Sequence, residues 1–363
     1  MPATPELPNP FAMKDGTPLR SASEWPRRRR EILDLVVRIE YGGLPPAPSR
    51  VEGEELHSHT IERFGNARHS QYRIRTGPRT GISFVLDLLV PSGDGPQPVI
   101  LNGDGCWRTL TDDIIRAVLC RNYVLAQFNR VEMAPDTYTT RRDSGLYLLY
   151  PDESFGALAA WAWGFHRCVD FLLTLDFVNH ARIAVTGHSR GGKAALLAGA
   201  TDERIALTAP NGSGCGGAGC YRFLGQGAES LADILGPVRY WFDAGLKEYI
   251  GREAELPFDQ HFLKALVAPR ALLSTEAFGD LWANPTGTWQ THAAASEVYR
   301  FLGAGGQIGI HYRQGDHDHT MDDWNALLDF ADWQLRGQPR RQDFAANPFA
   351  DLPRAWSWRA PPG

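Results

Sequence analysis

The strongest chemical signal in the sequence is a serine flanked by glycines, in Gly187-His-Ser-Arg-Gly191, which fits the pattern G-x-S-x-G. It lies between a short apolar run, 182–185, and a segment of helical character, 192–200. In that context a sharp turn from strand to helix exposes the serine hydroxyl, and glycines are needed because neighbouring side chains would collide. The pattern therefore predicts that Ser189 is a nucleophile.

A serine hydroxyl needs a base to take its proton, and two histidines lie where this architecture presents one. His317 and His319 follow the apolar run 307–312 and precede a segment of helical character. His317 is nearer the predicted strand and is the favoured base, with His319 as the alternative. The following histidines are expected to be structural: His188 beside the serine, and His57, His59 and His69 on predicted strands.

The third partner is a carboxylate that holds the imidazole in the correct tautomer, and it should follow the penultimate strand. That strand is predicted at 270–274, and the next turn contains Asp280 directly after a glycine. Asp280 is the favoured acid. Glu276 is the alternative, since it could still belong to the strand.

Charge that develops on the substrate oxygen must be met by hydrogen-bond donors that are already in place. The amide of Arg190 is one expected donor, and a second is expected from the loop 102–107 after the first central strand. The guanidinium of Arg190 could face the same charge, and Lys193 lies one helical turn beyond Ser189. Two cations beside one nucleophile are not needed for packing, so both are candidate site residues.

The elements that must position these residues follow a repeating pattern, in which short apolar runs alternate with helical segments. The predicted strands are 98–101, 123–126, 182–185, 205–208, 270–273 and 307–310, and helical stretches between them include 112–120, 157–175 and 324–335. This alternation is typical of a mostly parallel sheet flanked by helices. The fold class is therefore α/β, and with the G-x-S-x-G turn it is an α/β-hydrolase fold.

The region before these strands has a different pattern of apolar residues. Ser23 is expected to cap a helix that ends near 42–43, and a period of two from 51 to 90 predicts antiparallel strands on the N-terminal side. Strand breaks are expected at Gly77-Pro78 and Gly81.

No repeat or linker divides the chain into independent units. We expect a single catalytic domain over residues 1–363, with an N-terminal helical extension over 1–50 and an irregular tail over 337–363.

Composition excludes several classes of protein. Of the 363 residues, 43% are hydrophobic and 22% are charged, which excludes a disordered, collagenous or coiled-coil chain. A net charge of -5 offers no broad basic surface for nucleic acid. The sequence contains no run of 18 apolar residues, so no membrane span is predicted. The Pro-rich start lacks the pattern of a secretory signal peptide. A monomer is the default expectation.

Five cysteines are too few for a disulfide scaffold. Cys215 and Cys220 lie in a Gly-rich loop without a matched second pair, so they make a weak metal site. We expect neither a metal nor an organic cofactor.

Four stretches together resemble the glucuronoyl esterases, family fifteen of the carbohydrate esterases: 186–193, 211–217, 280–285 and 315–318. The resemblance implies hydrolysis of the ester between glucuronic acid, often 4-O-methylated, on xylan and a lignin alcohol. It implies Ser189 as nucleophile, His317 as base and Arg190 as oxyanion donor. By the same likeness Lys193, Glu229 and Trp282 contact the sugar. It also points to an exported protein, extracellular or periplasmic, although the chain itself shows no export signal and a cytoplasmic location stays open.

Two departures distinguish the chain from fungal members of that family. Fungal members carry the acid as a glutamate after an earlier strand, at the position that matches Gly212 here. The chain therefore resembles bacterial members, whose acid follows the later strand, and this favours Asp280 as the acid. Fungal members also join the residues beside serine and histidine by a disulfide, and here those positions are His188 and Asp318.

Two other functions use the same sequence features. An acetyl xylan esterase or general carboxylesterase would employ the same three residues, but would cleave a small acetyl ester at least as well as methyl glucuronate. A non-catalytic carbohydrate-binding protein on a hydrolase scaffold would instead use some of the eleven Trp and eleven Tyr as sugar platforms.

Overall fold

The computed structural model describes residues 6–76, 81–106, 110–137 and 142–362. Trp107, at the end of the loop expected to supply an oxyanion donor, lies outside the described residues. The same holds for the predicted strand break at Gly77-Pro78.

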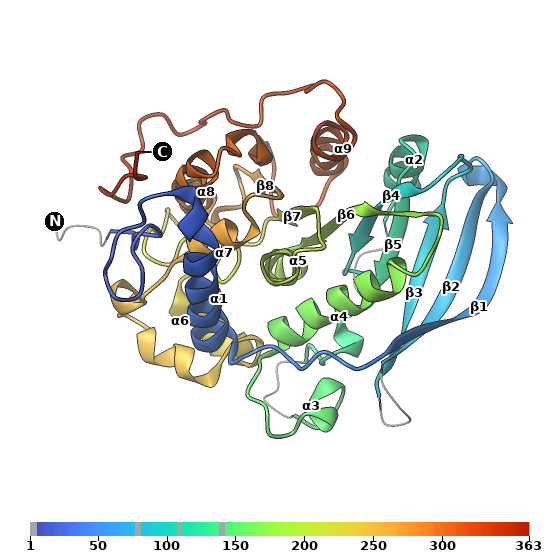
Figure 1. Ribbon diagram of the computed structural model, residues 1–363, viewed down its shortest axis with the longest axis horizontal. Coiled ribbons are helices and arrows are strands. Elements are labelled where there is room, and N and C mark those ends of the chain that lie inside the picture. Colours follow the sequence, from blue (N-terminus) through green and yellow to red (C-terminus); the bar gives the residue numbers. More distant parts are fainter. Residues whose placement is uncertain (1–5, 77–80, 107–109, 138–141, 363) are drawn as a thin grey trace.

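A nine-stranded sheet runs through the molecule in the order β1-β2-β3-β5-β4-β6-β7-β8-β9 (Figure 1). Its parallel strands are β4 (Gln97–Asn102), β5 (Val124–Phe128), β6 (Val178–His188), β7 (Leu207–Asn211), β8 (Ala271–Ala277) and β9 (Ile308–Arg313). The antiparallel strands are β1 (Val51–Ile61), β2 (Ala67–Thr76) and β3 (Ser83–Val90), and β3 joins β5 antiparallel. The predicted α/β-hydrolase fold, with antiparallel strands on the N-terminal side, is confirmed.

Helices cover both faces of this sheet (Figure 1). They are α1 (Trp25–Tyr41), α2 (Asp112–Cys120), α3 (Leu146–Leu149), α4 (Ala157–Leu172), α5 (Arg190–Thr201), α6 (Leu231–Val238), α7 (Gln260–Val267), α8 (Pro285–Phe301) and α9 (Met321–Arg336). One apolar cluster joins α2 and α9 to one face, and a larger cluster joins α1, α4, α5 and α7 to the other. None of the described helices is long and apolar enough to cross a membrane.

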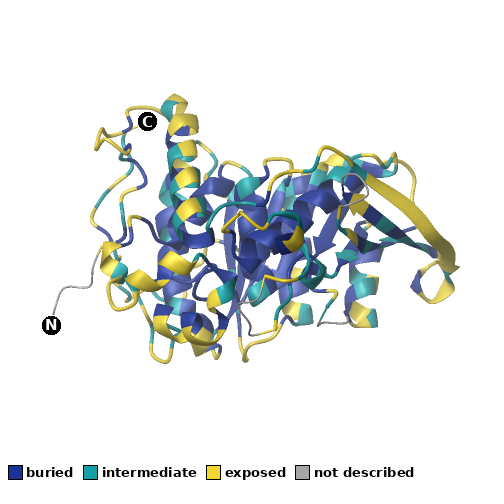
Figure 2. Cartoon of the chain, turned by 90° about the horizontal axis from the view of Figure 1, so that it is seen from below, coloured by how far each residue is buried: buried dark blue, intermediate teal, exposed yellow. Residues whose placement is uncertain are grey.

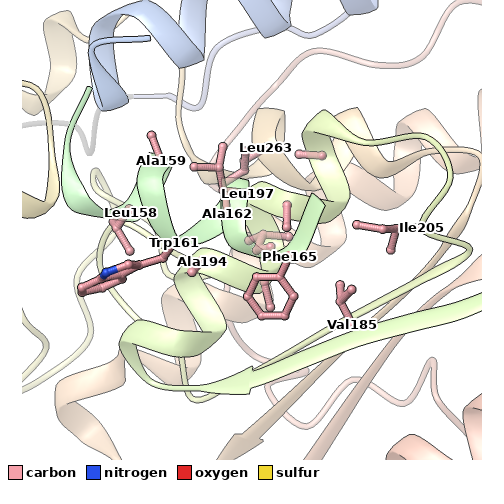
Figure 3. Packing of buried hydrophobic residues seen from close by; sticks show 14 of the residues in the cluster. Leu158, Ala159, Trp161, Ala162, Phe165, Val185, Ala194, Leu197, Ile205 and Leu263 are labelled. Atoms are coloured by element: carbon pink, nitrogen blue, oxygen red, sulfur yellow. The ribbon is translucent and has the colours of Figure 1, made fainter. Parts of the chain in front are cut away.

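The centre of the larger cluster is α4, in which every residue except Asp170 is buried. Trp161 and Phe165 of α4 pack beside Ala194 and Leu197 of α5 (Figure 3). A helix with so little exposed surface must be surrounded by protein, and α4 lies against α5, β1 and β6. This packing fixes α5, the helix that begins directly after Ser189.

The first and last described segments, near Leu7 and Ala355, lie together on the α1 and α8 side (Figure 1). The tail from 337 to 362 contains no helix or strand, and the amide of Leu7 donates to the carbonyl of Ala355 over 2.8 Å. The predicted cap at Ser23 is wrong. A short 3-10 turn, Ala22–Glu24, precedes α1, and the Ser23 hydroxyl pairs instead with that of Ser21 at 2.7 Å.

Candidate active site

The turn between β6 and α5 holds Ser189 in a strained backbone conformation, with φ 56° and ψ -121°. A positive φ is rare for a residue with a side chain, so the surroundings must enforce it. A Cβ added at Gly187 would lie 2.5 Å from the carbonyl oxygen of Gly191, and one added at Gly191 would lie 2.0 Å from Asp104 Oδ1. The glycines on both sides of the serine are therefore required by close packing.

Three side chains from distant parts of the sequence meet at the carboxyl ends of the strands. His317 Nε2 lies 2.9 Å from Ser189 Oγ, and His317 Nδ1 lies 2.5 Å from Asp280 Oδ2. The carboxylate accepts the Nδ1 proton, which leaves the Nε2 lone pair facing the serine hydroxyl. Asp280 is buried, whereas the His317 side chain is 41% exposed, so the imidazole is open to a substrate.

Glu276, the alternative acid, lies within β8, whereas His317 Nδ1 pairs with Asp280. Neither of its carboxylate oxygens has a hydrogen-bond partner among the described residues, and burial raises its pKa well above the ordinary value. Lys264 is the cation that most opposes this rise, and burial lowers the pKa of Lys264 to about 7. Of the two candidates, only Asp280 is positioned to orient the imidazole.

His319, the alternative base, packs its ring on Trp324 with centroids 5.0 Å apart, away from the serine contact that His317 makes. His188 lies in between, with its Nδ1 2.5 Å from Asn211 Oδ1 and its ring centroid 4.5 Å from that of His317. Both contacts of His188 fit the structural part expected of it.

Arg190 is the first residue of α5 and turns its guanidinium toward a buried carboxylate. Its Nη1 donates to Asp136 Oδ2 over 3.0 Å, and its guanidinium lies over the Trp241 ring, 4.7 Å from the centroid. Asp136 also accepts from Tyr240 Oη at 2.5 Å and from Trp241 Nε1 at 3.1 Å. A cation is thereby held in a defined position beside the nucleophile.

The three predicted sugar contacts lie in one neighbourhood. Lys193 Nζ donates to the carbonyl of Ser213 over 2.5 Å and lies 4.0 Å from Glu229 Oε2. Burial lowers the pKa of Lys193 and raises that of Glu229. The amide of Glu229 donates to the carbonyl of Trp282 over 3.0 Å, and Trp282 is 55% exposed. The group combines an exposed indole, a carboxyl and an ammonium, which suits a polyhydroxylated ring.

Comparison with known proteins identifies the family. The model of the family described as glucuronyl esterase, fungi, matches residues 75–303. A 4-O-methyl-glucuronoyl methylesterase of Schizophyllum commune is 34% identical over 336 residues, 89% of this chain and 79% of that protein. The chain belongs to the glucuronoyl esterase family.

Solved structures of glucuronoyl esterases agree with this assignment. The chain is similar to a carbohydrate esterase family 15 glucuronoyl esterase of Caldicellulosiruptor kristjansonii, with a TM-score of 0.84, 33% identity, and coverage of 98% and 97% of the two chains. It is also similar to a glucuronoyl esterase mutant of Sporotrichum thermophile in complex with methyl 4-O-methyl-β-D-glucopyranuronate, with a TM-score of 0.78, 28% identity, and coverage of 95% and 92%.

Position 212 lies beside the catalytic imidazole of this glucuronoyl esterase. Gly212 has a φ of +47°, and a Cβ added there would lie 3.4 Å from Asp280 Oδ2 and 3.6 Å from His317 Nδ1. A side chain at 212 would thus face the same imidazole edge that Asp280 occupies.

The five cysteines, including Cys215 and Cys220, are free thiols.

Two buried residues that sequence reasoning missed brace the nucleophile turn of this esterase. Asp104 Oδ2 accepts the amide of His188 over 2.6 Å, and Asp104 also pairs with the guanidinium of Arg130. The carbonyl of Asn211 accepts the amide of Ser189 over 2.9 Å. The one signal for Asp104 is its place in Gly103-Asp-Gly105, directly after a central strand.

Several backbone amides of the loop after β4 already donate hydrogen bonds within the protein, so only part of this loop can supply a donor to an oxyanion. The amides of 103, 104 and 105 donate to Thr186 O, Asn102 Oδ1 and Phe128 O at 3.4, 3.1 and 3.0 Å. Arg190 heads α5, where first-turn amides lack an acceptor within the helix. A second donor from this loop therefore stays a prediction and rests on Cys106 or on Trp107, which lies outside the described residues.

Proposed function

We propose that this glucuronoyl esterase hydrolyses the ester between glucuronic acid, with or without a 4-O-methyl group, on xylan and a lignin alcohol. The observation that carries the proposal is the chain of contacts from Ser189 through His317 to Asp280, at 2.9 and 2.5 Å. The names of the relatives, and the methyl 4-O-methyl-glucopyranuronate bound to one of them, support the uronic ester as substrate.

In the first half of the reaction, His317 Nε2 takes the hydroxyl proton while Ser189 Oγ attacks the ester carbonyl. The carbonyl oxygen becomes an oxyanion, and the imidazolium is stabilised by Asp280. When the tetrahedral intermediate collapses, the bond to the lignin oxygen breaks and the alcohol leaves with the proton from Nε2. The uronic acyl group is then bonded to Ser189.

In the second half, water attacks the acyl carbon while His317 Nε2 takes one of its protons. Collapse of the second tetrahedral intermediate breaks the bond to Ser189 Oγ, which regains the proton. The product is glucuronic acid, which ionises to the uronate, and the side chains return to their starting state.

Charge explains the cation beside the serine. The esterified carboxyl is neutral in the ground state and acquires negative charge only as the tetrahedral intermediate forms. The amide and guanidinium of Arg190, the latter held by Asp136, therefore stabilise the transition state more than the substrate. Lys193, Glu229 and Trp282 are proposed to bind the sugar hydroxyls and ring.

The test compares two substrates on the purified chain, a methyl ester of glucuronic acid and a small acetyl ester. The proposal expects the higher kcat/KM on the glucuronate, and expects Ser189→Ala to lower turnover by about 10³-fold or more. Faster cleavage of the acetyl ester would instead assign an acetyl xylan or general carboxylesterase. Unchanged turnover in Ser189→Ala would exclude this serine mechanism altogether.

The proposed substrate also bears on location and assembly. Because glucuronoxylan joined to lignin is a cell-wall polymer, we propose that the protein acts outside the cell or in the periplasm. We propose that it acts as a monomer, since all three members of the catalytic group come from one chain. Light scattering of the purified protein would test the monomer.

A further inference from the structure

The antiparallel end of the sheet carries a cluster of histidines that ester hydrolysis does not use. β1 is the edge strand, and four strands, β2, β3, β5 and β4, separate it from β6, which leads into Ser189 (Figure 1). The outer ribbon of this end is exposed (Figure 2). A ligand bound here would therefore be remote from the reaction centre.

Strand geometry brings His57, His59 and His69 onto one face. His57 and His59 are two residues apart on β1, and His59 is directly paired with His69 on β2. The ring centroids lie 5.5, 5.6 and 5.1 Å apart in the three pairs. One ring nitrogen from each residue lies within 4.8 Å of the other two.

A break in strand register places His57 in this cluster. The pairing of β1 with β2 shifts between Glu55 and His57, so that Glu55 pairs with Tyr72 and His57 with Gln71. Glu55 accepts a hydrogen bond from Tyr72 Oη over 2.8 Å. Bulges of this kind redirect a side chain, and here the redirected side chain is the third imidazole.

One histidine has the hydrogen bond that orients metal ligands. His69 Nε2 lies 2.9 Å from Asp87 Oδ1 on β3, and Asp87 Oδ1 also accepts from Gln71 Nε2 over 2.7 Å. A carboxylate that accepts the proton of one ring nitrogen leaves the other nitrogen, Nδ1, with its lone pair free for a cation. Asp87 therefore prepares His69 as a ligand.

We propose that His57, His59 and His69 bind one late first-row divalent cation, with Zn²⁺ as the reference ion. Three imidazole nitrogens favour Zn²⁺, Ni²⁺ or Cu²⁺ over the oxygen-preferring Mg²⁺ and Ca²⁺. Zn–N bonds of about 2.0–2.1 Å in a tetrahedron place the nitrogens about 3.3 Å apart. His57 and His59 are exposed and need only small side-chain rotations to close from within 4.8 Å.

The consequence of binding is mechanical. The cation would join the edge strand β1 to β2 through three side chains, with a fourth coordination position facing solvent. A ligand that binds only the folded state raises stability, so Zn²⁺ should raise the melting temperature of the protein. Because the cluster lies at the other end of the sheet, turnover of the ester should not depend on the cation.

The experiment uses the full chain, stripped with a chelator and titrated calorimetrically with ZnCl₂. We expect one Zn²⁺ per chain, a loss of about tenfold or more in affinity for His59→Gln, and a loss of about tenfold for Asp87→Asn. His180→Gln is the matched control, because His180 is an exposed histidine outside the cluster. Zn²⁺ should raise the melting temperature of the wild type and of His180→Gln, but not that of a His57→Gln/His59→Gln variant.

Three outcomes would overturn the proposal. The first is no stoichiometric heat with Zn²⁺, and the second is equal affinity in the wild type and the His57→Gln/His59→Gln variant. The third is binding that survives in that variant and disappears in His317→Gln, which would move the ion to the active site. All variants should keep the circular dichroism spectrum of the wild type, and esterase turnover of the cluster variants should match the wild type without added metal.

Discussion

At the active site, two carboxyl groups only four residues apart have opposite surroundings. Asp280 lies in the turn after β8, where its Oδ1 accepts the amide of Ala283 over 3.2 Å and its Oδ2 holds His317. Glu276 is still within β8, fully enclosed, with Lys264 as its counter-charge. Position relative to the end of the strand, and not the type of acid, decides which of the two can serve the imidazole.

This contrast predicts the ranking of two conservative variants. Asp280→Asn should lower kcat by about 10³- to 10⁴-fold, because an amide cannot stabilise the imidazolium and favours the wrong tautomer. Glu276→Gln should leave kcat within a few-fold of the wild type. Steady-state kinetics on a methyl glucuronate, below the melting temperature of both variants, would measure the ranking. A larger loss in Glu276→Gln would reassign the acid.

Residues whose place is set by local sequence can be predicted, and those gathered by the fold cannot. Ser189 stands out because its turn requires glycines nearby, and His317 and Asp280 follow from chain order and strand ends. Asp136 gives no such signal, since its partners Arg190 and Trp241 are 54 and 105 residues away in sequence. It becomes recognisable only when the loops meet.

At the scale of elements, the helix that follows the nucleophile packs closely against the sheet at a glycine. A Cβ added at Gly199 of α5 would lie 1.9 Å from Thr208 Oγ1 of β7, and Thr208 is fully buried. Glycine is otherwise unfavourable inside a helix, so its presence here reflects the close approach of helix and strand. This contact brings the last turn of α5, the helix that begins after Ser189, close against β7.

Gly199→Ala is therefore expected to destabilise the fold despite the better helix propensity of alanine. Overpacking against Thr208 should lower the free energy of unfolding by about 1–3 kcal/mol. Gly306→Ala is the matched control: Gly306 is exposed, and its added Cβ would only touch Trp333 at 3.8 Å. The control should be neutral or stabilising by about 0.4–1 kcal/mol. Urea denaturation would measure both, and equal effects would contradict the packing argument.

Elements with a long periodic pattern are visible in the sequence, whereas their ends are less so. The apolar run 205–208 marks β7, but the strand is Leu207–Asn211, because the chain turns at 205 before pairing begins. The eight-residue helices α6 and α7 are too short to give a strong period. In the fold all eight residues of α7 are buried, polar ones included, so no solvent-facing side gives it a readable pattern.

Across the whole molecule, a buried carboxyl joins the N-terminal helix to the body of the protein. Glu40, near the end of α1, accepts hydrogen bonds from Tyr221 Oη at 2.8 Å and from Gln260 Nε2 of α7 at 2.9 Å. Burial raises the pKa of Glu40 from 4.5 to about 7, against the opposing effect of these hydrogen bonds. The N-terminal extension is therefore held by a group that ionises near neutral pH.

The raised pKa of Glu40 gives stability a pH dependence of known sign. Between 4.5 and about 7 the native chain keeps a proton that the unfolded chain has lost, so the free energy of unfolding falls as pH rises. The contribution is fully present below the unfolded pKa and is lost as pH passes the folded pKa, a change of about 3 kcal/mol at most. Glu40→Gln cannot ionise and lacks this contribution. Denaturation of both proteins should show the wild type losing stability relative to Glu40→Gln as pH rises from 4.5 to about 7, and a constant difference would contradict the assignment.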